Sequence, residues 1–145
     1  SSGSLILGLD GAKMSKSRGN TIELRMTADE TAKLLKRAVT DSDRHITYDP
    51  AHRPEVSNLL TLAGLATGRD PRAIAEEIGD GGGGGLKRYL TEVLNEMLAP
   101  IRARRAELAA DPGYLDDVLA AGNAKANAVA DATLLEVRQA MGMRY

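Results

Sequence analysis

The sequence lacks cysteine altogether, and none of its apolar runs approaches the length of a membrane span. The absence of cysteine excludes disulfides, thiolate catalysis and zinc sites with cysteine ligands, and it fits a reducing compartment. A membrane-spanning helix needs about 20 consecutive apolar residues, and no signal-peptide pattern opens the chain. We therefore expect a soluble, cytoplasmic protein.

The chain also lacks an excess of charge of either sign, because 20 acidic residues stand against 19 lysines and arginines. No global positive field attracts nucleic acid, so any contact with it has to be local. A chain of 145 residues with 43% hydrophobic residues has room for one core of ordinary domain size, but not comfortably for two. We expect one domain with an appendage.

The most informative stretch is GAKMSKSRGNTIEL, residues 11–24, which concentrates lysines, serines and an arginine. Mobile ammonium groups beside hydroxyl and amide donors suit a polyphosphate whose charge shifts during a reaction. An isolated K-x-x-K is more often a solvated surface loop. The complete string KMSKS, placed between an apolar run and a capped helix, favours the phosphate-binding interpretation.

The apolar run before this loop, residues 5–9, ends at Asp10-Gly11 and predicts a buried strand. Nothing later in the chain resembles a second strand. Because a strand needs neighbours for its amide and carbonyl groups, we expect the rest of its sheet to lie upstream, in residues that this chain lacks. The first four residues, SSGS, resemble a linker or a surface loop.

The remainder of the chain has a helical pattern. Thr27 and Glu30 have the spacing of a capping box, and Gly68 is placed to end a helix. These and similar start and stop signals predict five helices, in a bundle: from 28 to about 39, 54–67, 71–78, from 86 with a kink at Pro100, and from 112 onward.

Five consecutive glycines, residues 81–85, precede the fourth predicted helix. Such a run has high backbone entropy and no side chains to pack, so it predicts a mobile loop. It does not match a phosphate-binding P-loop, since no strand precedes it and no Gly-Lys-Ser/Thr ends it. The two histidines, His45 and His52, are interpreted as a connector residue and a surface or capping residue.

The string Lys13-Met14-Ser15-Lys16-Ser17 resembles the signature loop of class I aminoacyl-tRNA synthetases. From about residue 5 to the C-terminus, separated segments resemble the tryptophanyl-tRNA synthetase family in order and spacing: KRAVTDSD (36–43), RPEVSNLLTLAGLATG (53–68), LAPIRARRAEL (98–108) and TLLEVRQAMG (133–142). Tyrosyl-tRNA synthetases share the architecture and are the alternative branch.

This resemblance implies that Lys13 and Lys16 are catalytic and steady the phosphates of ATP, with Mg²⁺ as a cofactor. It also implies that Met14 lies near the adenine and that Ser15 and Ser17 donate further hydrogen bonds. Nucleotidyl transfer depends mainly on positioning and on stabilising charge, which such a loop supplies. The intact enzyme would join tryptophan to tRNA(Trp) through a tryptophanyl-adenylate.

The resemblance further implies a mainly α chain, in which residues 5–26 end a Rossmann-type nucleotide-binding domain and residues 27–145 form a helical anticodon-binding domain. The second signature of the family, of His-Ile-Gly-His type, is absent from the sequence. The tryptophan pocket and the homodimer interface would also lie in the missing half. We therefore expect the chain by itself to be inactive.

The turn after the first predicted helix contains Asp41, Asp43 and Arg44, which the resemblance places near tRNA. Their carboxylates are able to accept from base amino groups, and the guanidinium to stack or to bind a phosphate; capping of the turn by Asp41 and Ser42 is an equal alternative. Two basic groups, Lys87-Arg88 and Arg102-Arg104-Arg105, either belong to a solvated helix face with i,i+4 partners or contact the tRNA backbone. A helical RNA-binding or interaction module without catalysis remains the rival hypothesis.

Overall fold

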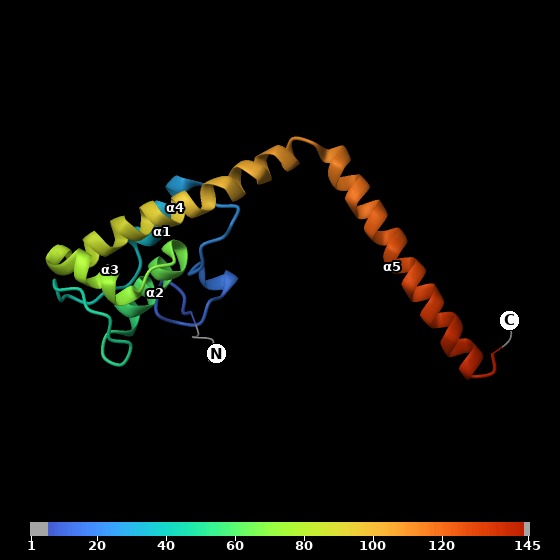
Figure 1. The fold of residues 1–145 in the computed structure, drawn as a ribbon, viewed down its shortest axis with the longest axis horizontal. Helices are drawn as coiled ribbons and strands as arrows, with labels where there is room; N and C mark the ends of the chain where they lie inside the picture. Colours follow the sequence, from blue (N-terminus) through green and yellow to red (C-terminus); the bar gives the residue numbers. More distant parts are fainter. Residues whose placement is uncertain (1–5, 144–145) are drawn as a thin grey trace. The chain divides into compact units, whose positions relative to one another are not determined.

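The computed structural model of the chain describes residues 6–143 (Figure 1). These residues contain no β-strand, and the short 3-10 turns η1 (Lys16–Arg18) and η2 (Gly79–Gly81) accompany the helices. The α-helices are α1 (Ala28–Lys36), α2 (Pro54–Thr67), α3 (Pro71–Ile78), α4 (Gly82–Ala109) and α5 (Pro112–Ala140). The chain divides into two compact units between Ala103 and Arg104.

The core of the first unit lies among α1, α2, α3 and the first part of α4. Helix α4 contributes a leucine at every fourth position, so that these side chains form one buried stripe along the helix. The stripe consists of Leu86, Leu90, Leu94 and Leu98. Leu35 of α1, Leu60 of α2 and Ile74 of α3 are each 0% exposed and belong to the same core.

Local capping signals set the helix starts as predicted. The Thr27 hydroxyl accepts from the backbone N–H of Glu30, whose carboxylate accepts from the N–H of Thr27. Helix α3 begins with the predicted cap and proline, since the Asp70 side chain accepts from the N–H of Arg72. Helix α2 ends at Gly68, which has a left-handed φ of 71°.

Helix α1 ends at Lys36, earlier than the predicted position near Val39. The N–H groups of Arg37 and Ala38 bond to carbonyls only three residues back, which tightens the last turn. The N–H of Val39 instead donates to the carbonyl of Leu9 at 2.8 Å. This contact with a distant segment takes Val39 out of the helix.

The prediction of a mobile loop for residues 81–85 is wrong. Gly81 ends η2, and α4 begins at Gly82, which is buried and has a φ of 66°. A Cβ added to Gly83 would lie 2.7 Å from Oγ1 of Thr40, closer than a Cβ atom approaches an oxygen that it contacts. Glycine is used here because it lets the first turn of α4 approach the segment after α1.

The predicted strand at residues 5–9 is not observed in its described part, residues 6–9; Leu5 lies outside the described residues. The side-chain amide of Asn58, on α2, bonds to Leu7 as a neighbouring strand would. Its Oδ1 accepts from the N–H of Leu7 at 2.9 Å, and its Nδ2 donates to the carbonyl of Leu7 at 3.1 Å. These contacts satisfy the backbone of Leu7 without a sheet.

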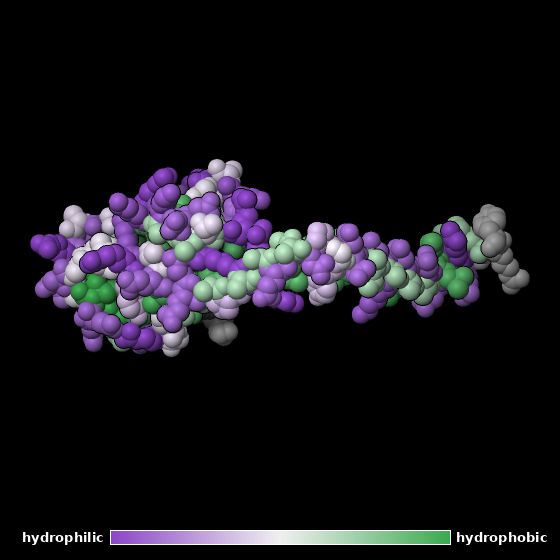
Figure 2. All heavy atoms as spheres, turned by 90° about the horizontal axis from the view of Figure 1, so that it is seen from above, coloured by the Kyte–Doolittle hydropathy of each residue, from purple (hydrophilic) through white to green (hydrophobic). Residues whose placement is uncertain are grey.

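The predicted bundle is confirmed for α1, α2, α3 and the first part of α4, whereas for α5, which belongs to the second compact unit, it stays a prediction. No residue of α5 is buried, and Figure 2 shows apolar residues at the surface along this helix. The large exposed apolar side chains of α5 are Tyr114, Leu115, Val118, Leu119, Val129, Leu134, Leu135 and Val137.

Helix α4 continues through Pro100 to Ala109, and the predicted kink at Pro100 stays a prediction. Between residues 6 and 143, no helix is both long and apolar enough to cross a membrane.

Candidate functional site

The candidate site is the segment of residues 10–20, here called the lysine loop, which lies in the first unit. Its base is closed by backbone hydrogen bonds from Gly8 to the carbonyl of Ala12 at 2.7 Å and from Leu9 to the carbonyl of Asn20 at 3.0 Å. Gly11 and Gly19 have φ of 77° and 61°, a conformation that strains other residues. The base of the loop is therefore folded tightly between two glycine turns.

The two predicted catalytic lysines are on the outside of this loop. Lys13 and Lys16 are both exposed, and neither forms an ion pair with a carboxylate in the described part of the chain. The hydroxyls of Ser15 and Ser17 are hydrogen-bonded to each other at 2.8 Å. The loop thus presents two free ammonium groups and two hydroxyls on a fixed base.

Met14, the residue expected near the adenine, is 42% exposed. It borders an apolar cavity of about 190 Å³ that separates the loop from α2 and α4. Leu7, Leu62, Leu94 and Met97 are among the other residues that line this cavity. The inner side of the loop thus faces apolar side chains, whereas its outer side is charged.

Sequence reasoning missed Asn20, whose side chain lies inside the loop and is 5% exposed. Its Oδ1 accepts from the N–H of Ser15 at 2.9 Å, and its Nδ2 donates to Oδ1 of Asp10 at 2.8 Å and to the carbonyl of Lys13 at 3.1 Å. A buried asparagine is visible in the sequence only as one more polar residue of a loop. Its role depends on how the loop closes.

The hydrogen bond from Asn20, followed by one from the N–H of Ala12, lowers the pKa of the Asp10 carboxyl. Arg18 lies 3.9 Å from this carboxylate. The charge of this arginine is thus partly balanced within the loop, whereas Lys13 and Lys16 have no carboxylate partner among residues 6–143.

The loop fits the phosphates of ATP better than it fits a metal ion. Among residues 6–143, no group of three or more aspartate, glutamate, histidine or cysteine side chains is placed to hold a metal. Mg²⁺ is commonly held in nucleotide sites by phosphate oxygens and water with one or two carboxylates. The residues of this loop would therefore hold phosphates, and Mg²⁺ would be carried by the phosphates themselves.

The predicted tRNA-contact residues lie in the connector between α1 and α2, which Arg53 organises. Nε and Nη2 of Arg53 each donate to one carboxylate oxygen of Asp41 at 2.7 Å. Nη1 donates to the carbonyl of His45 at 2.6 Å and to Oγ1 of Thr47 at 2.9 Å. With its side chain only 11% exposed, Arg53 ties the connector together, a role that the sequence analysis missed.

The two hydrogen bonds from Arg53 give Asp41 a structural role. The paired guanidinium lowers the pKa of its carboxyl, and Oδ1 also accepts from the N–H of Asp43, which confirms the predicted capping of the turn by Asp41. Asp43 and Arg44 remain exposed. The Asp43 carboxylate also accepts from the N–H of His45 at 3.0 Å and lies 3.9 Å from Nη1 of Arg53, so it takes part in the internal contacts of the connector.

Both histidines are paired with carboxylates. Nδ1 of His45 lies 2.7 Å from Oδ1 of Asp80, and the backbone N–H of Ile46 donates to the carbonyl of Gly79 at 2.8 Å. His52 is paired with Asp49 at 2.8 Å. These contacts agree with the interpretation of the two histidines as connector and surface residues.

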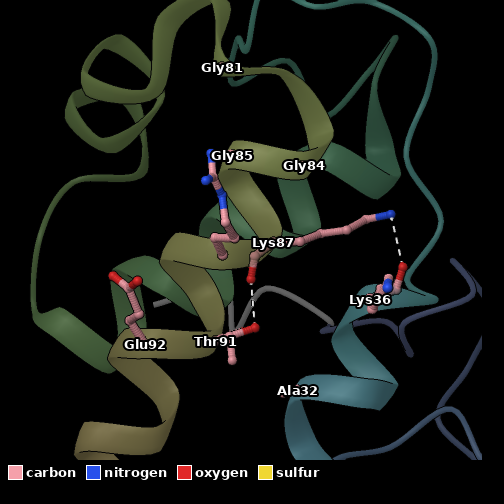
Figure 3. A pocket seen from close by; sticks show the side chains of 9 residues that line it. Ala32, Lys36, Gly81, Gly84, Gly85, Lys87, Thr91 and Glu92 are labelled. Atoms are coloured by element: carbon pink, nitrogen blue, oxygen red, sulfur yellow. Dashed lines mark hydrogen bonds between the residues drawn. The ribbon is translucent and has the colours of Figure 1, made fainter.

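A second cavity, of about 610 Å³, lies between α1 and the first turns of α4 (Figure 3). Nζ of Lys87 donates to the carbonyl of Lys36 at 3.4 Å across this space. A Cβ at Gly84 would meet no atom within 4 Å, so this glycine faces open space. The lining residues are Ala32, Lys36, Gly81, Gly84, Gly85, Lys87, Arg88, Thr91 and Glu92.

Arg102 belongs to the structure of the helical body. Its Nη1 donates to Oδ1 of Asn95, and its Nη2 donates to Oγ1 of Thr31, both at 2.8 Å. The bond to Asn95 stays within α4, and the bond to Thr31 joins α4 to α1. Arg104 is paired with Glu107 on the same helix at 2.9 Å. Among the basic residues considered for RNA contact, Lys87 and Arg88 line the cavity of about 610 Å³.

A lysine loop of this sequence in front of a helical body is the arrangement of a class I tRNA synthetase. The chain belongs to this family: the family model described as tRNA synthetases class I (W and Y) matches residues 2–99. Curated relatives place the resemblance in the tryptophan branch. The chain is 42% identical over 137 residues to the tryptophan–tRNA ligase of Thermosynechococcus vestitus, covering 92% of this chain and 42% of the relative.

Other comparisons agree. The chain is 42% identical over 115 residues to tryptophan–tRNA ligase 1 of Streptomyces coelicolor, covering 79% of this chain and 34% of the relative. The crystal structure of tryptophanyl-tRNA synthetase from Campylobacter jejuni complexed with ADP and tryptophan matches with a TM-score of 0.76 and 29% identity, covering 96% of this chain and 44% of that one. The predicted resemblance is confirmed, and the chain spans less than half the length of these relatives.

Proposed function

We propose that the chain is part of a tryptophan–tRNA ligase, in which the lysine loop binds the triphosphate of ATP. The observation that carries the proposal is the pair of exposed lysines, Lys13 and Lys16, on a loop whose base is fixed by hydrogen bonds. Two ammonium groups without internal partners are suited to a polyanion. The relative solved with ADP and tryptophan supports a nucleotide as the ligand.

In the proposed reaction, a carboxylate oxygen of tryptophan attacks the α-phosphorus of ATP, and the bond between the α-phosphorus and the bridging oxygen breaks. Pyrophosphate leaves with the electron pair of that bond. Lys13 and Lys16 balance the charge that grows on the departing phosphates, while Ser15 and Ser17 donate hydrogen bonds to them. Mg²⁺ would bind the phosphate oxygens and neutralise part of the same charge. The resulting adenylate then transfers tryptophan to tRNA(Trp).

The proposal assigns the remaining steps to a longer protein. Residues 5–26 would end its nucleotide-binding domain, of Rossmann type, and residues 27–145 would form its anticodon-binding domain. The upstream half would supply the tryptophan pocket and the contacts of a homodimer, and the protein would act in the cytoplasm. The chain alone would then lack the amino-acid site and would not form the adenylate.

For tRNA, the proposal keeps Asp41, Asp43 and Arg44 and gives them different tasks. Asp43 and Arg44, both exposed, would contact the nucleic acid directly. Asp41 would keep the connector in shape through its two hydrogen bonds with Arg53. Lys87 and Arg88 border the cavity beside α1. Their positive charges would attract the RNA backbone locally.

The loop assignment is tested by ATP–pyrophosphate exchange in the longer protein with Lys16→Ala. Loss of one charge-stabilising donor costs about 2 to 4 kcal/mol at a transition state, which corresponds to about 30- to 900-fold in rate. Lys125→Ala, at an exposed position of α5, is the matched control and should keep the parental rate. Parental exchange in Lys16→Ala would remove the catalytic role of the loop.

A second candidate function is RNA binding without catalysis. The cavity at the start of α4 favours this function, because binding of RNA there would need no upstream half of the protein. The 145-residue chain would then bind tRNA by itself, with an affinity that falls steeply as salt rises. Lys87→Ala should weaken this binding and reduce its salt dependence. Absence of binding by the chain at low salt would exclude this second candidate.

A further inference from the structure

We infer that Asn20 is a positioning residue for the lysine loop and that it acts through the backbone on both sides of Met14. The inference rests on the proposed phosphate-binding function of the loop. Asn20 contacts no ligand in this account. Its side chain instead sets where Lys13 and Ser15 lie, and Ser15 directly precedes Lys16.

The hydrogen bonds of Asn20 reach across the whole loop. Its Nδ2 donates to Asp10 at 2.8 Å and to the carbonyl of Lys13 at 3.1 Å, and its Oδ1 accepts from the N–H of Ser15 at 2.9 Å. Its own carbonyl accepts from the N–H of Leu9 at 3.0 Å. The residue at the end of the loop therefore bonds to the start and to the middle of the loop.

The space for this side chain is provided by Gly8. A Cβ at Gly8 would lie 2.3 Å from Nδ2 and 2.5 Å from Cγ of Asn20, distances that atoms in contact do not reach. Gly8 is absent from the set of residues with positive φ, so its backbone conformation does not require glycine. The missing side chain at Gly8 is explained by the amide group that lies against it.

The chemistry of the site requires an amide at position 20. Asparagine donates through Nδ2 and accepts through Oδ1, and both functions are used here. Aspartate has nearly the same shape but only accepts, so it would leave the carbonyl of Lys13 without its donor. It would also place a second carboxylate against Asp10 at the distance of a hydrogen bond.

A fixed backbone with mobile side chains suits the proposed reaction. The bonds to Lys13 and Ser15 hold the two positions that flank Met14, and the ammonium groups remain in solvent on their flexible stems. Freezing the backbone in advance reduces the ordering that would otherwise be needed at the transition state. Asn20 would thus affect the rate without touching the phosphates.

The first experiment measures ATP–pyrophosphate exchange in the longer protein with Asn20→Asp, Asp10→Asn and the double substitution. A misplaced catalytic group costs up to about 100-fold in rate, and we expect a loss of this order in kcat for Asn20→Asp. The double variant exchanges donor and acceptor between positions 10 and 20 and removes the carboxylate pair. It should recover about tenfold of the lost rate, because the bond between positions 10 and 20 is restored. The recovery should be incomplete, because the N–H of Ala12 bonds to the same Oδ1 of Asp10 and loses this acceptor.

A double-mutant cycle separates positioning from general stability. If Asn20 acts through the loop lysines, Asn20→Asp should cost little further activity in a Lys16→Ala background, and thermal melting should stay near that of the parent. Additive losses, or a loss that merely follows a lower melting temperature, would overturn the inference. So would a parental rate in Asn20→Asp together with an impaired Lys16→Ala.

A second measurement does not depend on catalysis. Trypsin cleaves after Lys13, Lys16 and Arg18, and the cleavage rate reports how often the loop opens. Asn20→Asp should raise this rate by about tenfold if its bonds close the loop. An unchanged cleavage rate would overturn the inference. If Lys16→Ala keeps parental exchange while Asn20→Asp still speeds cleavage, the proposed function fails and the loop-closing role of Asn20 stands.

Discussion

Two neighbouring glycines at the start of α4 provide a direct test of why the glycine run is helical. A Cβ on Gly83 would lie 2.7 Å from Oγ1, 3.1 Å from Cβ and 3.3 Å from Cγ2 of Thr40. A Cβ on Gly84 would have no atom within 4 Å. Gly83→Ala and Gly84→Ala therefore make the same chemical change in a crowded place and in an open one.

The two substitutions should change the free energy of unfolding in opposite directions. Alanine is favoured over glycine inside a helix by about 1 kcal/mol, and less in the first turn, so Gly84→Ala should stabilise by about 0.5 kcal/mol. Crowding a packed contact costs about 1 to 3 kcal/mol. After the same helical gain, Gly83→Ala should destabilise by about 0.5 to 2.5 kcal/mol.

Urea unfolding of the 145-residue chain, followed by circular dichroism, measures both variants against the parent. Thr40→Ala removes Oγ1 and Cγ2, so the cost of Gly83→Ala should shrink in that background. Equal stability of Gly83→Ala and Gly84→Ala would refute the close approach of α4 to Thr40. The reason given for the glycine at position 83 would then be wrong.

Three further predictions concern the stability of the first unit, measured by urea unfolding. Leu90→Ala empties a fully buried position and should cost about 2 to 5 kcal/mol. Thr27→Ala removes the capping box of α1 and should cost about 1 kcal/mol. Arg53 lowers the pKa of Asp41 from 3.8. The contribution of Asp41 to the free energy of unfolding is therefore present above pH 3.8 and is lost as the pH falls through the lower pKa of the folded state. Arg53→Ala should weaken this dependence of stability on pH, and an unchanged pH dependence would contradict the pairing.

Much of the helical body could be predicted because its signals are local. The starts of α1 and α3 depend on a side chain and a backbone N–H within three residues, and the sequence shows both partners. The end of α1 could not be placed, since it depends on a bond between Val39 and Leu9. The glycine run was misjudged for the same reason, because the contact that favours glycine at position 83 lies with Thr40.

The candidate site shows the same division between local and distant information. Lys13 and Lys16 could be recognised from a contiguous string of residues. The roles of Asn20 and Arg53 depend on loops closing on themselves, Arg53 reaching back 12 positions to Asp41. The sequence shows those residues as ordinary polar side chains, and only the folded backbone brings their partners within bonding distance.

The short segment Leu7–Gly8–Leu9 has a consequence for how a larger sheet would be assembled. Each N–H and each carbonyl of these three residues is already bonded, to Asn58, to the turn that follows, or to Asn20 and Val39. An incoming strand would therefore find no unbonded N–H or carbonyl group at these three residues. The same saturation protects this apolar stretch from edge-to-edge association with other chains when the 145-residue chain is made alone.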